Sequence, residues 1–158
     1  MTQSLSFAFI SASWHADIVD QARKGFEARI RETLPDAVID TFAVPGAFEM
    51  PLVAKKLAQT GKYSAIAAGA LVVDGGIYRH EFVAQSVVQG LMDVGLETGI
   101  PVLSVSLTPH HFQPTEDHQA FFFDHFEGKG REAANAALQL AALEGRLTAT
   151  PLRDTSAA

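Results

Sequence analysis

The chain of 158 residues contains no cysteine and has few positive charges. The lack of cysteine excludes thiol catalysis, iron–sulfur clusters and thiolate zinc sites, and it suits the reducing cytosol, so we expect a cytoplasmic protein. Lys and Arg number 12 against 18 Asp and Glu, which gives a net charge of −6. Such a chain has no basic field that could gather the phosphates of a duplex, so nucleic acid is not an expected partner.

Long apolar runs are also missing. The longest, Ala65–Val73, is far shorter than the ~20 residues that span a bilayer. No segment is typical of a basic helix on a membrane surface. The first residues carry no positive charge ahead of an apolar run, so we expect no signal peptide and no membrane partner.

What the sequence does contain is typical of a globular protein. Apolar residues make up 47% and charged residues 19% of the chain, and the length fits one domain. We therefore expect a single domain over residues 1–158, with the small and polar residues 148–158 as a frayed tail.

Apolar, β-prone runs alternate with amphipathic segments along the chain. The predicted strands are Leu5–Ser11, Val38–Val44, Tyr63–Val73 and Val102–Leu107. The predicted helices are a segment from an N-cap at Asp17 to Leu34, then Ala47–Thr60, His80–Thr98, a short His118–Phe126 and an alanine-rich Arg131–Leu143. This alternation implies right-handed crossovers. We predict an α/β fold, a three-layer α/β/α sandwich around a four-stranded, parallel, flavodoxin-like sheet.

Ligands of such sheets bind outside the carboxyl ends of the strands. This rule places four loops, distant in sequence, at one edge. They are Ser13–His15, Val44–Glu49, Leu71–His80 and Ser104–His111. We expect the functional residues to lie there.

Trp14 is the only tryptophan and follows the first predicted strand. Its indole could stack on a planar heterocycle, or it could plug the end of the core. The sequence alone does not decide between these two roles.

Pro45–Glu49 joins a strand to a helix. Gly46 permits a tight turn, after which the first free N–H groups of the helix face the ligand edge. Glu49 could cap that helix, or its carboxylate could accept hydrogen bonds from N–H donors of a heterocycle.

Asp74-Gly75-Gly76 also lies between a strand and a helix. The two glycines could form an anion nest that holds a phosphate, or a turn without a ligand. The segment matches no nucleotide-binding motif.

Four histidines, His110, His111, His118 and His125, come close together in the sequence. Adjacent side chains diverge, and two helical positions seven residues apart are separated by about 10 Å. One metal ion needs all its ligands about 2 Å away, so we predict no metal site. The neighbouring Phe121–Phe123 and Phe126 are either a core patch or a subunit interface.

The segment Val44-Pro45-Gly46-Ala47-Phe48-Glu49-Met50-Pro51-Leu52, the later Gly-Gly loop with Tyr78-Arg79-His80, and Gly128-Lys129-Gly130 resemble the 6,7-dimethyl-8-ribityllumazine synthase family. The match runs from about Phe7 to Leu143. Trp14-His15, Asp74–His80 and Leu107–Phe112 are most similar to the second, decamer-forming branch of that family.

This resemblance implies the penultimate step of riboflavin biosynthesis. In that step, 5-amino-6-(D-ribitylamino)uracil condenses with 3,4-dihydroxy-2-butanone 4-phosphate, and phosphate and water are lost. The two small molecules are the implied partners, together with further copies of the chain in pentamers that pair into a decamer. The chemistry needs no metal or redox cofactor, because holding both reactants in near-attack geometry can supply ~7–11 kcal/mol.

The resemblance also assigns roles to residues. It places Trp14 against the pyrimidine, with Ala47, Phe48 and Glu49 around the pyrimidine and ribityl chain, Leu71, Val72 and Val73 along the ring edge, and Gly75 and Gly76 at the phosphate. Ser104 stands where the family often has a phenylalanine that reaches a neighbouring subunit's site. His118 falls in the segment that supplies a basic phosphate contact across that interface.

The sequence departs from the family at the loop after the third strand. Asp74 stands where most members have arginine, and Ile77 stands where they have a phosphate-binding threonine. Arg79 aligns with the usual proton-transfer histidine and His80 follows it, so both are candidate catalytic residues. Two other functions stay open, namely a non-catalytic flavin or lumazine binder and an assembly whose shell matters more than its site.

Overall fold

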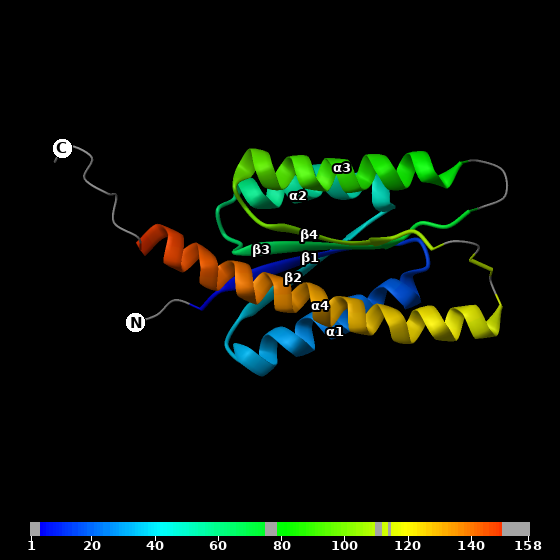
Figure 1. The fold of residues 1–158 in the computed structure, drawn as a ribbon, viewed down its shortest axis with the longest axis horizontal. Helices are drawn as coiled ribbons and strands as arrows, with labels where there is room; N and C mark the ends of the chain where they lie inside the picture. Colours follow the sequence, from blue (N-terminus) through cyan, green and yellow to red (C-terminus); the bar gives the residue numbers. More distant parts are fainter. Residues whose placement is uncertain (1–3, 75–78, 110–111, 114, 150–158) are drawn as a thin grey trace, which may run out of the picture.

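A parallel sheet forms the middle layer of the molecule (Figure 1). The computed structural model describes residues 4–74, 79–109, 112–113 and 115–149. Within them the strands are β1 (Ser6–Ala12), β2 (Val38–Val44), β3 (Ala65–Leu71) and β4 (Val102–Leu107), in the order β2-β1-β3-β4. The helices are α1 (Ala16–Thr33), the 3₁₀ turn η1 (Ala47–Glu49), α2 (Met50–Gln59), α3 (His80–Thr98) and α4 (Glu116–Ala149).

Helices cover both faces of the sheet. α1 and α4 lie on one face, and α2 and α3 lie on the other (Figure 1). Side chains of β3 enter both cores in turn, with Ala67 in the first and Ala68 in the second. Because helices cover both faces of the sheet, the side chains of a central strand are buried on either side. This explains why β3 is apolar and buried throughout. The predicted three-layer α/β/α sandwich is confirmed.

Several predicted boundaries were wrong. β3 is shorter than Tyr63–Val73, because its ladder with β4 ends at the pair Leu71 and Leu107. The first helix has His15 rather than Asp17 as N-cap, since the amides of Ile18 and Val19 already donate to the carbonyl oxygen of His15.

The two helices predicted at His118–Phe126 and Arg131–Leu143 form one helix, α4. The intervening Glu-Gly-Lys-Gly sequence is a weak helix former. In the structure a Cβ on Gly130 would overlap the backbone of Ala22, and one on Gly25 would overlap the backbone of Glu127. The glycines therefore allow α1 and α4 to pack closely, and this contact outweighs their low helix propensity.

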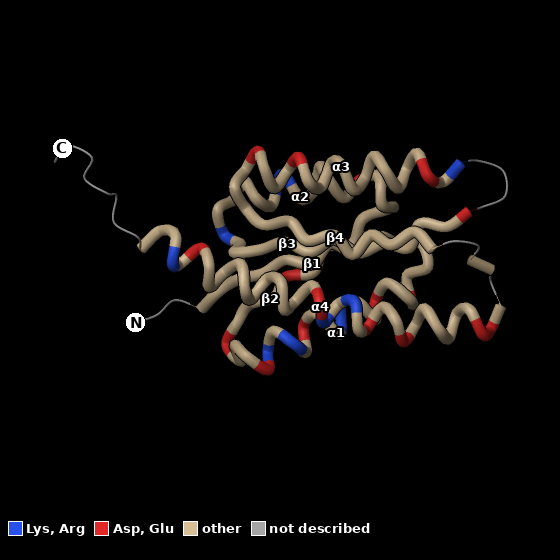
Figure 2. Tube along the Cα trace, in the orientation of Figure 1, with Lys and Arg blue, Asp and Glu red and all other residues tan. Residues whose placement is uncertain are grey.

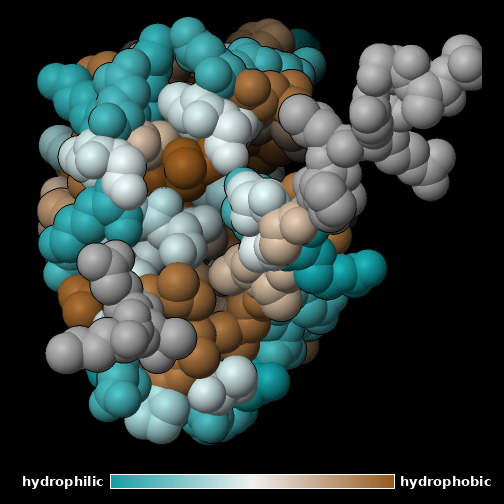
Figure 3. Space-filling view, turned by 90° about the vertical axis from the view of Figure 1, so that its left-hand side faces the viewer, coloured by the Kyte–Doolittle hydropathy of each residue, from teal (hydrophilic) through white to brown (hydrophobic). Residues whose placement is uncertain are grey.

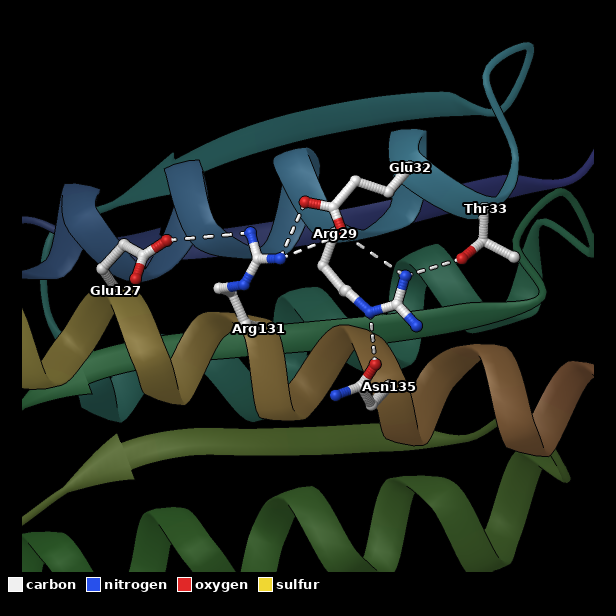
Figure 4. A network of polar contacts seen from close by, with 6 residues as sticks. All are labelled: Arg29, Glu32, Thr33, Glu127, Arg131 and Asn135. Atoms are coloured by element: carbon white, nitrogen blue, oxygen red, sulfur yellow. Dashed lines mark hydrogen bonds and ion pairs between the residues drawn. The ribbon is translucent and has the colours of Figure 1, made fainter.

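Polar side chains join the same two helices at the surface (Figure 4). Arg131 donates to both carboxylate oxygens of Glu32, at 2.7 and 3.0 Å, and Arg29 donates to Asn135 at 2.6 Å. The hydrogen bonds from Arg131 lower the pKa of Glu32. The exposed contacts between Arg131 and Glu32 are expected to add little stability, because solvent screens them.

Charge is unevenly distributed between the helix layers (Figure 2). Acidic and basic residues are frequent along α1, whereas α3 carries none between Glu81 and Asp93. In the described part of the chain, no helix is long and apolar enough to cross a membrane.

Candidate ligand site at the carboxyl ends of the strands

The carboxyl ends of the parallel strands lie together with the beginnings of α1, α3 and α4, at the right of Figure 1. The described parts of the first three predicted loops lie at this edge, as do Thr108 and Pro109 of the fourth. Ser104–Leu107, which were predicted as part of the fourth loop, instead belong to β4. Figure 3 shows the opposite end, where apolar surface is exposed near the two termini.

Ser13 links the loops that follow β1 and β2. Its amide donates to the carbonyl oxygen of Val44 at 3.1 Å, and its hydroxyl donates to the same oxygen at 2.7 Å. The next residue, Trp14, lies against Gly46 of the second loop. A Cβ built on Gly46 would meet indole atoms Cζ2 and Cε2 at 2.5 and 2.6 Å.

Trp14 is 44% exposed to solvent. The core-plug role is therefore wrong for this chain, because a plug would be buried. The indole instead presents an open aromatic surface at the ligand edge.

The segment Ala47–Glu49 forms the 3₁₀ turn η1. Ala47 is fully buried and anchors the turn, while Phe48 is 65% exposed. Glu49 precedes α2 but makes no side-chain hydrogen bond to cap it. The carboxylate is exposed, so it lies available to N–H donors of a ligand rather than serving as a helix cap.

At the end of β3, main-chain groups rather than side chains are available to a ligand. Leu71 packs into the core under α1 and α4, Val72 packs into the core under α2 and α3, and Val73 borders the first of these. Their predicted contact with a ligand ring would therefore run through main-chain groups. Gly75 and Gly76 lie outside the described residues.

α3 begins beside this edge with the two candidate catalytic residues. Arg79 is exposed at the N-cap and its guanidinium lies 5.8 Å from the ring centroid of Phe82. The His80 side chain retains 16% of its exposure, with Nδ1 3.6 Å from a carboxylate oxygen of Glu81.

The beginning of α4 is tied to the Trp14 loop by aromatic rings. Phe112 is buried and lies 5.4 Å from the ring of His15 and 6.3 Å from that of His118. The Nδ1 atom of His118 accepts a hydrogen bond from the amide of Gln113 at 3.1 Å. His118 is thus fixed near the edge, with its side chain exposed.

The phenylalanine cluster has two parts. Phe126 is fully buried in the core, whereas Phe121 and Phe123 are 60% and 39% exposed. The core role holds for Phe126, while the exposed Phe121 and Phe123 leave surface that a partner could cover, so the interface role stays a prediction.

Ser104 does not join the site of its own chain. It is exposed in the middle of β4, and β3 and β1 lie between it and β2. Two strand spacings alone put it roughly 10 Å from β1. Ser104 instead lines a groove of about 420 Å³ with Val88 and Met92 of α3 and Lys129 of α4.

No three His, Cys, Asp or Glu side chains converge into a metal-binding group within the described residues. His110 and His111, two of the histidines considered above, lie outside those ranges.

Two features of the site were missed by sequence reasoning. The contacts of Ser13 with Val44 and of Gly46 with Trp14 join loops that are about thirty residues apart. The only signal in the sequence was that both segments follow strands of one parallel sheet, which does not specify contacts.

Comparison with known proteins finds relatives that cover most of the chain. A sequence model of the family described as 6,7-dimethyl-8-ribityllumazine synthase matches residues 4–144. A protein of Pseudomonas syringae pv. tomato named 6,7-dimethyl-8-ribityllumazine synthase 2 is 65% identical over 80% of this chain and 75% of its own length. A 6,7-dimethyl-8-ribityllumazine synthase of Rhodococcus erythropolis is 56% identical over 85% of this chain and 87% of its own. A third relative, synthase 2 of Bradyrhizobium diazoefficiens, is 51% identical over 90% and 88%.

Proposed function

This chain belongs to the 6,7-dimethyl-8-ribityllumazine synthase family, and we infer from this membership that it condenses 5-amino-6-(D-ribitylamino)uracil with 3,4-dihydroxy-2-butanone 4-phosphate. The products are 6,7-dimethyl-8-ribityllumazine, phosphate and water. The protein is thus an enzyme of riboflavin biosynthesis, and a non-catalytic flavin binder is not favoured. The observation that carries the site assignment is the exposed indole of Trp14 held against Gly46 at the ligand edge.

The pyrimidine binds against Trp14 in this proposal. Stacking on the indole fixes the plane of the ring, and the exposed Phe48 gives a second apolar contact. The uncapped carboxylate of Glu49 accepts hydrogen bonds from N–H groups or from ribityl hydroxyls. Ala47 and the backbone of Leu71–Val73 bound the ring edge.

The butanone phosphate binds on the side of α3. Gly75 and Gly76 are proposed to donate amides to the phosphate, and Arg79, exposed at the N-cap of α3, adds a positive charge next to it. A guanidinium stays protonated near neutral pH, so Arg79 holds substrate charge. His80, which begins α3 beside Arg79, is the proposed proton carrier.

The reaction follows from this placement. The 5-amino group attacks the ketone, water leaves to give an imine, phosphate is eliminated, and the ribitylamino nitrogen closes the ring with loss of a second water. Each step moves protons between nitrogen, oxygen and solvent, which suits one histidine and bound water. The larger share of the acceleration comes from holding the two reactants together, which can supply ~7–11 kcal/mol.

A second copy of the chain is proposed to complete the site. The apolar groove beside β4 and the exposed Phe82, Met92 and Leu96 of α3 would be covered by that copy. Ser104 lies in this groove, and the family resemblance gives its position a role at a neighbouring subunit's site, so we propose that the second copy brings its own ligand edge against Ser104. Assembly into pentamers, paired into a decamer, follows the family resemblance, and a cytoplasmic location fits a chain without cysteine.

The activity is tested by mixing the purified protein with both substrates and following lumazine absorbance above the uncatalysed background. The expected result is faster lumazine formation in proportion to protein concentration. Tight riboflavin binding without any lumazine formation would contradict the proposal and support a flavin-binding protein.

A further inference from the structure

We propose that Gly46 is a positioning residue, whose missing side chain leaves the space in which the indole of Trp14 takes up its substrate-binding position. This proposal rests on the role given to Trp14 above. It adds that the orientation of the aromatic surface is set before substrate arrives, by contacts between two loops.

The backbone at Gly46 does not itself require glycine. Its φ of −154° and ψ of −179° describe extended backbone that other residues adopt readily. The space does require it, because a Cβ would lie 2.5, 2.6 and 3.0 Å from three atoms of the indole six-membered ring. Glycine is needed here for the neighbouring side chain and not for the turn.

The main chain on both sides is fixed, so it cannot move to relieve that overlap. Ser13 holds the carbonyl oxygen of Val44 with two hydrogen bonds, which tie the two loops together. On the other side of Trp14, His15 has a left-handed conformation with φ of 51°, and its carbonyl oxygen accepts hydrogen bonds from the amides of Ile18 and Val19 in the first turn of α1. A residue other than glycine in this conformation is uncommon and is kept only where its surroundings impose it.

The indole is therefore the group that would move. Trp14 is 44% exposed and can swing towards solvent without opening the core. A methyl group at position 46 should displace the aromatic surface while the fold stays intact, and a small displacement of a positioning group can cost up to about 100-fold in rate.

The first test needs no ligand, because Trp14 is the only tryptophan and its fluorescence reports this site alone. In Gly46→Ala we expect emission shifted to longer wavelength and stronger quenching by acrylamide, with the far-ultraviolet circular dichroism unchanged. Gly145→Ala is the matched control, since a Cβ there meets no atom within 4 Å. Fluorescence identical to that of the wild-type protein in Gly46→Ala would overturn the proposal.

The second test measures binding of the pyrimidine substrate with its 5-amino group replaced by nitro, which cannot react. Gly46→Ala should weaken binding by about tenfold, within the range of a lost base–aromatic stack. If Gly46 acts through Trp14, adding Gly46→Ala to a protein that already carries Trp14→Ala should alter the dissociation constant by no more than about twofold. An equal loss in both backgrounds would mean that Gly46 contacts the ligand itself, and would overturn the positioning role.

A third variant covers the case in which Gly46→Ala does not fold. The double variant Trp14→Phe/Gly46→Ala lacks the indole atoms that would meet the new Cβ. We therefore expect it to fold, and to bind the nitro-pyrimidine, like Trp14→Phe alone. Misfolding of this pair as well would show that the Cβ conflicts with the backbone, against the proposal. Failure of the wild-type protein to bind the pyrimidine would instead contradict the proposed function, while the ligand-free fluorescence would still decide the role of Gly46.

Discussion

Trp14 is the residue on which we propose that substrate binding depends most. It contributes little to the fold, because its indole is 44% exposed and lies on one glycine. Trp14→Ala should therefore weaken binding of the nitro-pyrimidine by ~1–3 kcal/mol and leave the melting temperature nearly unchanged. Titration calorimetry and thermal denaturation give both values. Trp14→Phe, which keeps a ring, should lose less, and unchanged affinity in Trp14→Ala would contradict the stacking role.

Arg79 and His80 have separable proposed roles, because the guanidinium is proposed to hold substrate charge and the imidazole to carry the proton. Adjacent side chains at the start of a helix point about 100° apart, so both are not expected to reach one atom. If His80 accepts protons during the reaction, the kcat of the wild-type enzyme should fall on the acidic side of its pH profile. His80→Gln should lose this acidic limb.

Arg79→Lys is the companion variant for the same pH series. It should keep the acidic limb but raise the KM for the butanone phosphate, since lysine keeps the charge and loses the paired donors. An unchanged pH profile in His80→Gln, with collapse of activity in Arg79→Lys, would leave the arginine as the catalytic residue.

The position of Trp14 could be predicted from the sequence, but its contact could not. A lone tryptophan directly after an apolar strand had to lie at the ligand edge once the sheet was known to be parallel. The contact between Gly46 and the indole depends on the orientation of two loops, which periodicity and residue type do not predict. The absence of a side-chain cap from Glu49 likewise required coordinates.

At the scale of elements, α4 shows how tertiary contacts override local preference. The sequence predicted a break near Gly128 and Gly130, because glycine is a poor helix former. The structure instead uses Gly130 as the point where α4 approaches Ala22 of α1. Helix propensity is local, whereas this close approach exists only after the two helices meet.

The same pair of glycines gives a matched test of the helix contact. Gly130→Ala should reduce the free energy of unfolding by about 3 kcal/mol or more, because its methyl group overlaps the backbone of α1. Gly128→Ala, two residues away with no atom within 4 Å, should increase it by up to about 1 kcal/mol. Urea denaturation measures both. Equal effects at the two positions would show that α4 does not pack closely on α1.

The polar contacts between α1 and α4 should depend on pH in a defined direction. Hydrogen bonds from Arg131 lower the pKa of Glu32 in the folded protein. Their contribution to the free energy of unfolding is therefore fully present above the usual glutamate pKa of about 4.3. It is lost as the pH falls through the folded value. Wild-type protein should thus melt above Glu32→Gln near neutral pH, and the two melting temperatures should converge once the pH lies below the lowered pKa of Glu32. A difference that persists in acid would mean that the substitution acts through packing.

At the scale of the whole molecule, the sequence predicted the architecture better than the surface. The three layers followed from the alternation of strands and helices, and the central place of β3 followed from its apolar residues. Which apolar side chains of α3 remain exposed could not be predicted, because Val87 and Leu91 are buried while Val88 and Met92 are not. Periodicity gives a helical face, but not how far that face extends past the edge of a sheet.

The exposed face of α3 has the composition expected of a surface that a second copy covers. Phe82, Met92 and Leu96 are 63%, 58% and 78% exposed, and no charged residue lies between Glu81 and Asp93. A monomer in water rarely keeps so many large apolar side chains exposed along one helix. Light scattering of the wild-type protein should therefore give a mass several times 16.9 kDa at micromolar concentration.

Met92→Lys should break this assembly, because it places a charge on the apolar side of α3 that we propose a second copy covers, in the groove beside Ser104. Since we propose that a second copy completes the site, specific activity should fall with the mass, by about tenfold or more. Leu147→Lys is the matched control, as Leu147 is 62% exposed near the end of α4 and does not line that groove. It should change neither mass nor activity. A Met92→Lys monomer that keeps full activity would show that each chain holds a complete site, and the shared-site proposal would then be wrong even if the wild-type protein is an oligomer.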